Sequence, residues 1–102
     1  MIIYNVTVNV EDGILDDWKN WMTDVHIKDV LQTGLFSGYT FSQVLVEEES
    51  GTTYSIQYFT ADMESFQLYE QLYAKKLREE TAKKFGQKIV AFRTLLKIID
   101  SK

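Results

Sequence analysis

The order in which hydrophobic periodicity changes along the chain constrains its fold more than any other feature of the sequence. Residues 1–10 alternate between two faces, one of which carries Ile2, Tyr4, Val6, Val8 and Val10. A period of two is typical of a β-strand, because successive side chains point to opposite sides of the sheet. Three further strands are predicted, over residues 35–47, 52–60 and 87–98. Gly51, in the loop before the third strand, suits the positive φ that hairpin loops often need.

Two segments between these strands follow the helical period instead. The first helix opens at residues 11–13 and ends near Gly34. Its predicted apolar stripe is Leu15, Trp18, Met22 and Val25, and the helix then either continues or jogs through Ile27, Val30 and Leu31. The second is predicted over residues 63–85, after Asp62 as N-cap, and its predicted stripe is Phe66, Tyr69, Tyr73 and Leu77.

The resulting order, β-α-β-β-α-β, predicts an α+β fold of the ferredoxin-like type. Such a plait has a four-stranded antiparallel sheet in the order 4-1-3-2, with both helices on one face. A chain of 102 residues has room for one hydrophobic core. Residues 1–102 are therefore predicted to form a single domain.

The helix-free face of this sheet predicts self-association. The two central strands place Asn5, Thr7, Ser55 and Gln57 on that face, and neither strand carries a charged residue. A sheet face that stays in water is usually polar and charged. We therefore expect a second copy of the chain to cover it, giving a homodimer with its sheets packed face to face as an α/β barrel.

Composition and missing motifs exclude several classes of function. The chain has no cysteine, which excludes disulfides and thiolate metal sites, and no phosphate-loop, dinucleotide or zinc motif is present, so neither a metal nor a cofactor is predicted. The net charge of −4 argues against nucleic acid as a partner, and so does the absence of basic residues from the third strand. No apolar run approaches the ~20 residues of a membrane span and no signal peptide is recognisable, so a cytoplasmic protein without membrane contact is expected.

Four segments carry a resemblance to a known family. They are MIIYNVTVNV, WKNWMTDVHIKDVLQTGLFSGY, GTTYSIQYF and VAFRTLL. Together they resemble short bacterial proteins grouped as a domain of unknown function, most specifically in the block from His26 to Phe36. The resemblance implies a dimeric α/β barrel, a superfamily that includes cofactor-free monooxygenases, haem-degrading enzymes and small isomerases, but no activity. Lys28 stands where the family often has proline, which departs from its pattern.

The only histidine, His26, is the first candidate for chemistry. Its ordinary pKa lies near neutrality, so in a pocket it could act as a general base or bind a ligand by hydrogen bonds. Asp29, three residues later on the same helix, could orient the ring or raise its pKa. The alternative is a histidine on the helix surface that makes only a local ion pair.

A second set of candidates lies on the strands. Asn5, Gln57 and Arg93 could converge on the helix-free sheet face and bind a small polar or anionic ligand, with Arg93 as its anchor. The same groups could instead satisfy one another in a dimer interface. Tyr39 and Tyr58 could line an apolar cavity between sheet and helices, although aromatic residues at such spacing usually form core.

Two functions from different classes remain open on the sequence alone. One is a homodimeric small-ligand-binding or regulatory domain. The other is a cofactor-independent enzyme of the monooxygenase or isomerase type that uses His26 as general base. Self-association is expected in both, with a small molecule as the other possible partner.

Overall fold

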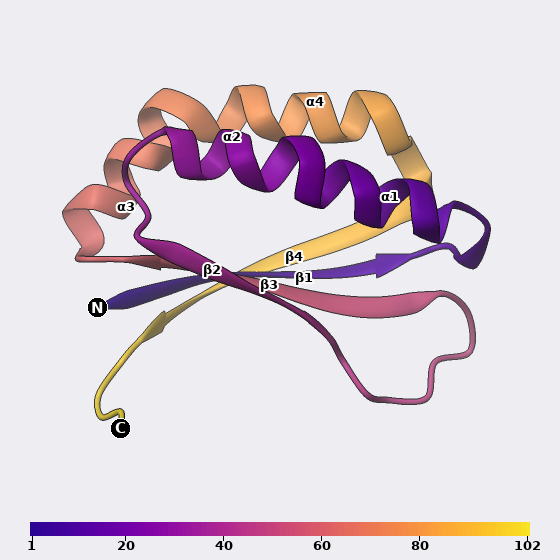
Figure 1. Ribbon diagram of the computed structural model, residues 1–102, viewed down its shortest axis with the longest axis horizontal. Coiled ribbons are helices and arrows are strands. Elements are labelled where there is room, and N and C mark those ends of the chain that lie inside the picture. Colours follow the sequence, from indigo (N-terminus) through magenta and orange to yellow (C-terminus); the bar gives the residue numbers. More distant parts are fainter.

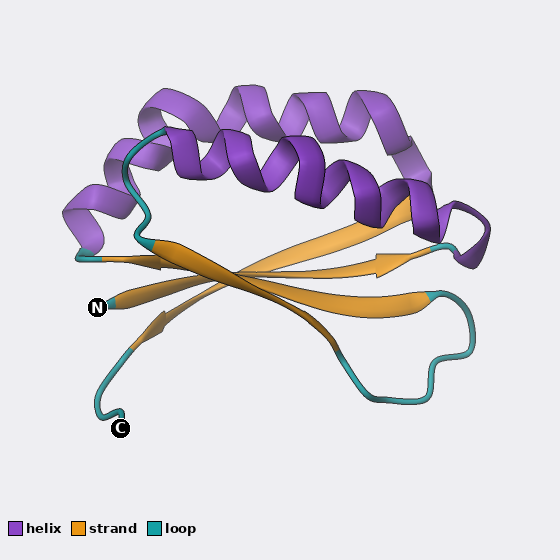
Figure 2. Ribbon diagram, viewed as in Figure 1, coloured by secondary structure: helices purple, strands orange, loops and turns teal.

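The computed structural model describes residues 1–102 and has two layers, a sheet and a pair of long helices on one of its faces (Figures 1 and 2). The strands are β1 (Ile2–Val10), β2 (Gly38–Gln43), β3 (Thr52–Thr60) and β4 (Ile89–Lys97). All neighbours pair antiparallel in the order β2-β3-β1-β4, which is the predicted order read from the other edge. The predicted ferredoxin-like plait is confirmed.

Each long helix is built from α-helical segments joined by one wide turn. The first runs through α1 (Leu15–Trp21), η2 (Met22–His26) and α2 (Ile27–Gln32), after a short 3₁₀ turn η1 (Asp12–Ile14). The second runs through α3 (Met63–Tyr69), η3 (Glu70–Ala74) and α4 (Lys75–Phe85), and the 3₁₀ turn η4 (Gly86–Lys88) leads into β4. Both η2 and η3 are π-helical, so each adds residues to one turn.

The alternation in the central strands decides which face the helices cover. On β1 the even-numbered side chains face the helices, and Val10 at its end is fully buried. On β3 the same holds for Tyr54, Ile56 and Tyr58, of which Ile56 is fully buried. Residues paired across antiparallel strands share a face. The pairs Tyr4–Tyr58 and Val8–Tyr54 therefore point together into the core.

The second strand is shorter than the predicted range 35–47. Phe36 leaves the sheet and is buried in the core, after Gly34 turns the chain at φ 78°. At the other end Leu45 is 88% exposed in the loop before β3. Gly51 closes this loop at φ 74°, as predicted, and a Cβ there would lie 2.8 Å from the carbonyl oxygen of Val10.

Each predicted apolar stripe contains one wrong residue just past its midpoint, whereas Ile27, Val30 and Leu77 are buried as predicted. Past Met22 the next buried residue on the stripe is Ile27, and Val25 is 41% exposed. Past Tyr69 it is Ala74, and Tyr73 is 39% exposed. In both helices the π-turn makes the buried face advance five residues where an α-helix advances three or four.

The face of the sheet opposite the helices carries few charges. Asn5 donates to Thr7 Oγ1 at 3.0 Å and accepts from Ser55 at 2.6 Å, so these polar groups satisfy one another. Val90 and Phe92 of β4 pair with Asn9 and Thr7 and are 69% and 61% exposed. This face thus presents neutral polar groups beside uncovered apolar ones. None of the helices combines the length and apolar character needed to cross a membrane.

Candidate functional site

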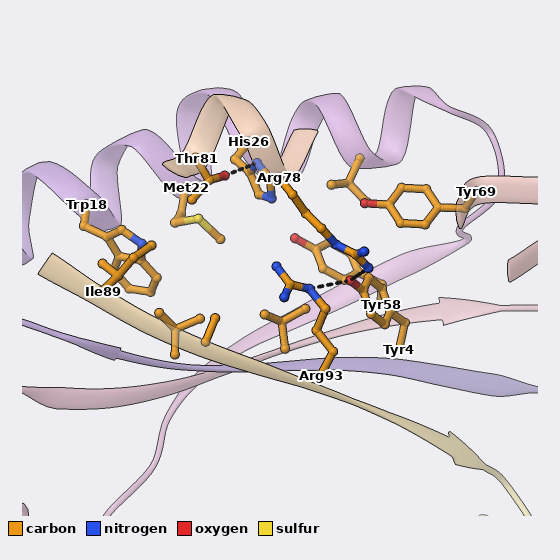
Figure 3. Close-up of a pocket in the computed structure, with 14 residues that line it drawn as sticks. Tyr4, Trp18, Met22, His26, Tyr58, Tyr69, Arg78, Thr81, Ile89 and Arg93 are labelled. Atoms are coloured by element: carbon orange, nitrogen blue, oxygen red, sulfur yellow. Dashed lines mark hydrogen bonds between the residues drawn. The ribbon is translucent and has the colours of Figure 1, made fainter. Parts of the chain in front are cut away.

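A cavity of about 50 Å³ lies between the helix layer and the sheet. Figure 3 shows side chains entering it from both layers. Its lining is mostly apolar, with a small set of tyrosine, arginine, histidine and threonine side chains: Tyr4, Val6, Val8, Trp18, Met22, His26, Val30, Tyr58, Tyr69, Arg78, Thr81, Ile89, Ala91 and Arg93. Apolar walls with a few converging polar groups are typical of sites for small ligands.

The hydroxyl of Tyr4 holds two arginines at the wall of the cavity. Arg78 of α4 and Arg93 of β4 each donate to Tyr4 Oη at 3.1 Å. Tyr4 itself is fixed by packing, because its ring lies 5.0 Å from that of Phe66 and 5.8 Å from that of Tyr69. One rigid phenol from the central strand therefore positions two guanidinium groups from different elements.

The charges of these arginines are not balanced. Arg78 pairs with Glu70 at 2.6 Å, and this is the only ion pair in the chain. Arg93 has no carboxylate partner, and its single side-chain hydrogen bond is the one from Nε to Tyr4. Its Nη groups, which carry most of the donors of a guanidinium, make no hydrogen bond within the protein. The arginine end of the cavity thus carries one positive charge without a carboxylate partner, on a side chain that is partly open to solvent.

His26 enters the cavity from the helix layer, at the end of the π-turn η2. Its ring stacks on Trp21 with 5.1 Å between the centroids, and Nδ1 lies 3.4 Å from Thr81 Oγ1. The Thr81 hydroxyl donates its one proton to the carbonyl of Leu77 at 3.1 Å. Toward His26 it can only accept, so Nδ1 carries the ring proton. The unprotonated Nε2 is directed to the cavity (Figure 3).

Burial keeps this histidine neutral. The pKa of His26 is lowered to about 4, chiefly by desolvation; the charge of Asp29 opposes this shift and the positive charge of Arg93 adds to it. Burial also raises the pKa of the Tyr58 and Tyr69 hydroxyls, so both stay protonated at neutral pH. The cavity therefore offers phenol and guanidinium donors, together with one imidazole acceptor.

The cavity also holds the polar groups that the fold leaves unsatisfied. Two buried side-chain polar atoms have no hydrogen-bond partner in this chain, Tyr58 Oη and Arg78 Nε. Both residues line the cavity, and Tyr58 is 2% exposed. The Tyr58 hydroxyl points into the space between His26 and Arg93 (Figure 3). A buried unpartnered polar group costs about 1–3 kcal/mol, so it marks a place where a partner group is expected.

The structure brings some of the predicted site residues together and separates others. His26, Tyr58 and Arg93 meet at the cavity. The predicted place of Arg93 on the helix-free face is wrong: it pairs with Val6 on β1 and so shares the helix-facing side. Asn5 and Gln57 pair with each other and stay on the helix-free face, away from Arg93.

Asp29 and Tyr39 lie outside the cavity. Asp29 is half-buried and borders a separate groove on the outer side of the helices. The atom that contacts the His26 ring is the Thr81 hydroxyl, so Asp29 does not orient the ring. Tyr39 pairs with Tyr58 but sits on the edge strand β2 and is 42% exposed.

Sequence reasoning missed Arg78 and Thr81. They lie four and seven residues after Ala74, on the helical face that ends at Phe85. This helical spacing from Ala74 is the feature of the sequence that could have identified them as residues of the buried face. The predicted stripe ran through Tyr73 and Leu77, and on that phase Arg78 falls on the outer surface and Thr81 falls beside the stripe.

The neutral histidine predicts a pH-dependent stability. The native pKa of His26, about 4, lies below its ordinary value of 6.5, so between these pH values the unfolded chain binds the extra proton. This contribution to stability is complete above pH 6.5 and is lost as the pH falls toward 4. Since part of the ring remains accessible, we expect a loss of about 2 kcal/mol.

Urea unfolding between pH 4 and pH 7.5 measures this loss in the wild-type protein and in His26→Gln. The variant should show a shallower fall in unfolding free energy over this range, because carboxylates titrate in both proteins and only the histidine differs. Equal slopes in the two proteins would contradict the buried neutral histidine.

Comparisons with known proteins agree with this architecture. Residues 1–99 match the model of a family described as a domain of unknown function (DUF4286). No curated protein matches the chain. A dimeric ferredoxin-like protein from an uncultured marine organism superposes with a TM-score of 0.75 at 14% identity, covering 100% of this chain and 98% of the other.

Two further solved structures have the same fold. HapK from Hahella chejuensis has a TM-score of 0.72 at 10% identity, covering 100% of this chain and 96% of its own. An EthD family protein from Bacillus halodurans has a TM-score of 0.72 at 13% identity, covering 97% of this chain and 100% of its own. At these identities the likeness extends to the fold alone.

Proposed function

This chain belongs to the DUF4286 family, a domain of unknown function, and we propose that it is a homodimeric domain that binds a small polar ligand in the cavity between sheet and helices. One observation carries the proposal. The two buried polar atoms that lack a partner in the protein both belong to residues lining that cavity, and one of them, Tyr58 Oη, points into it. Stability alone does not favour such groups, because phenylalanine would fill the place of Tyr58 without the unsatisfied hydroxyl.

The dimer in this proposal forms through the helix-free face of the sheet. That face combines mutually hydrogen-bonded polar groups with the exposed apolar side chains of Val90 and Phe92. Similar solved structures are described as dimeric ferredoxin-like proteins, which supports self-association. Two such sheets packed face to face, about 10 Å apart, would enclose this surface in a barrel.

The cavity also supports a second candidate, catalysis with His26 as general base. Its unprotonated Nε2 faces the space in which a substrate would sit. Its pKa of about 4, however, disfavours the imidazolium that a base must become. Binding without turnover is therefore the function that the isolated site supports best. Turnover would require a bound group that stabilises the protonated ring.

Native mass spectrometry of gently purified protein, beside a denatured sample, tests the proposal. We expect the mass of two chains plus a reproducible small-molecule adduct. Ala91→Leu, which fills the cavity from β4, should keep the dimer and lose the adduct. Ala82→Leu makes the same change at an exposed helix position and should retain it. An adduct that persists in Ala91→Leu would contradict a ligand in this cavity.

A further inference from the structure

The groups around the cavity are specific enough to define a chemical class of ligand. Resting on the proposed ligand-binding function, we infer that the cavity binds a short monocarboxylate that carries a hydroxyl on the neighbouring carbon. The carboxylate would lie against Arg93 and the Tyr58 hydroxyl, and the ligand hydroxyl would donate to His26 Nε2.

Charge and donor geometry identify the carboxylate. Arg93 has free Nη donors and no acidic partner, and the planar fork of a guanidinium matches the two oxygens of a carboxylate. Arg78 is already neutralised by Glu70, so the site carries a single net positive charge. A monoanion balances that charge, whereas a phosphate dianion would leave a negative charge in a cavity with mostly apolar walls.

The volume limits the size of the ligand. The cavity measures about 50 Å³, about one third of the 150 Å³ at which an engineered apolar cavity binds benzene. It therefore accepts a group of a few non-hydrogen atoms and excludes an aromatic ring. A two-carbon acid such as glycolate is a ligand of this size.

The hydroxyl follows from the tautomer of His26. Thr81 gives its proton to Leu77, so the ring proton sits on Nδ1 and Nε2 presents a lone pair to the cavity. The Tyr58 and Tyr69 hydroxyls and the two guanidinium groups donate at neutral pH, and the Thr81 hydroxyl is already paired with the ring. A simple carboxylate would accept hydrogen bonds from those donors but would leave the Nε2 lone pair without a hydrogen-bond donor. A hydroxyl next to the carboxylate supplies the missing proton donor.

Three small probes separate the two contributions: glycolate has both groups, acetate lacks the hydroxyl, and glycolamide lacks the charge. His26 is the only histidine, so its ring ¹⁵N signals report on this site without assignment ambiguity. In NMR titrations at constant ionic strength and pH 7, glycolate should produce a saturable shift of the Nε2 signal. We expect acetate to bind about 5- to 10-fold more weakly, and glycolamide at least about 10-fold more weakly.

Variants test the two assigned contacts with the carboxylate. Arg93→Gln should weaken glycolate binding about 10- to 100-fold, because it removes the charged fork. Lys97→Gln removes a positive charge from the same side of the same strand, outside the cavity, and should leave the affinity unchanged. Tyr58→Phe should weaken binding about 5- to 10-fold while the folded protein becomes no less stable, because the lost hydroxyl has no partner in the protein.

Failure of this inference is distinguishable from failure of the proposed function. Equal affinity for glycolate and glycolamide, undiminished binding by Arg93→Gln, or no saturable shift with glycolate would overturn the carboxylate assignment. Equal affinity for glycolate and acetate would overturn the hydroxyl contact with His26. Each of these results leaves the mass-spectrometric test of a ligand in the cavity standing. An adduct that persists in Ala91→Leu would instead contradict the proposed function, which is ligand binding in this cavity.

Discussion

Thr7→Lys is expected to convert the proposed dimer into a folded monomer. Thr7 lies at the middle of the central strand β1 on the helix-free face, between Ser55 of β3 and Phe92 of β4. By symmetry each dimer would bury two new ammonium groups, and the two residues paired with position 7 across the strands carry no charge. The effective cost of burying an unpaired ion is several kcal/mol. A loss of about 4 kcal/mol corresponds to a dissociation constant about 1,000-fold higher.

Sedimentation equilibrium over a range of protein concentrations measures this change. Thr23→Lys is the matched control, because Thr23 is an exposed residue on the first helix and the same charge is added there. Circular dichroism should show that Thr7→Lys keeps its helices and sheet, since the helix-facing core is untouched. A Thr7→Lys protein that remains dimeric would place the interface elsewhere.

Ile27→Ala is expected to lower the free energy of unfolding by about 2–4 kcal/mol, whereas Val25→Ala should change it by less than about 0.5 kcal/mol. Ile27 is 1% exposed and packs in the main core, while Val25, two residues earlier, is 41% exposed. Truncation of a buried isoleucine removes apolar contacts and leaves a cavity. Truncation of an exposed valine does neither, and alanine has the higher helix propensity.

Urea unfolding at one fixed protein concentration, followed by circular dichroism, measures both free energies. The pair tests the π-turn itself, because a continuous α-helix in the phase of Trp18 and Met22 would bury Val25. Equal losses in the two variants, or a larger loss for Val25→Ala, would contradict the observed phase of α2.

The topology of this fold follows from local patterns. The alternation of residues 1–10 and 52–60 is broken only near one end, where Ile3 and Phe59 lie on the polar face, and a shift of one residue would turn the apolar face of a strand to the other side. The strand order and the side covered by helices are therefore predictable from the sequence. The lone histidine is also identifiable as a candidate, because no other side chain in the chain has an ordinary pKa near neutrality.

The composition of the site is not predictable in the same way. Arg93 shares a face of β4 with Ala91 and Leu95, but the opposite face of that strand is also apolar. Its side and its contact with Tyr4 therefore follow only from the register between β1 and β4. Arg78 and Thr81 reach the cavity because η3 shifts the phase of the second helix. No single residue type in the sequence marks such a shift.

The sequence by itself determined the element order, the two faces of the sheet and the uncharged surface on which a dimer is expected. These features depend on side-chain periods fixed by backbone geometry, which act between residues a few positions apart. The tertiary structure alone decided where each helix widens into a π-turn. It also decided which polar side chains line the cavity between β1 and the helices. The positions of the π-turns are decided by packing, because the buried faces of both helices must fit against one sheet. The side chains that determine this fit are distant from one another in the sequence.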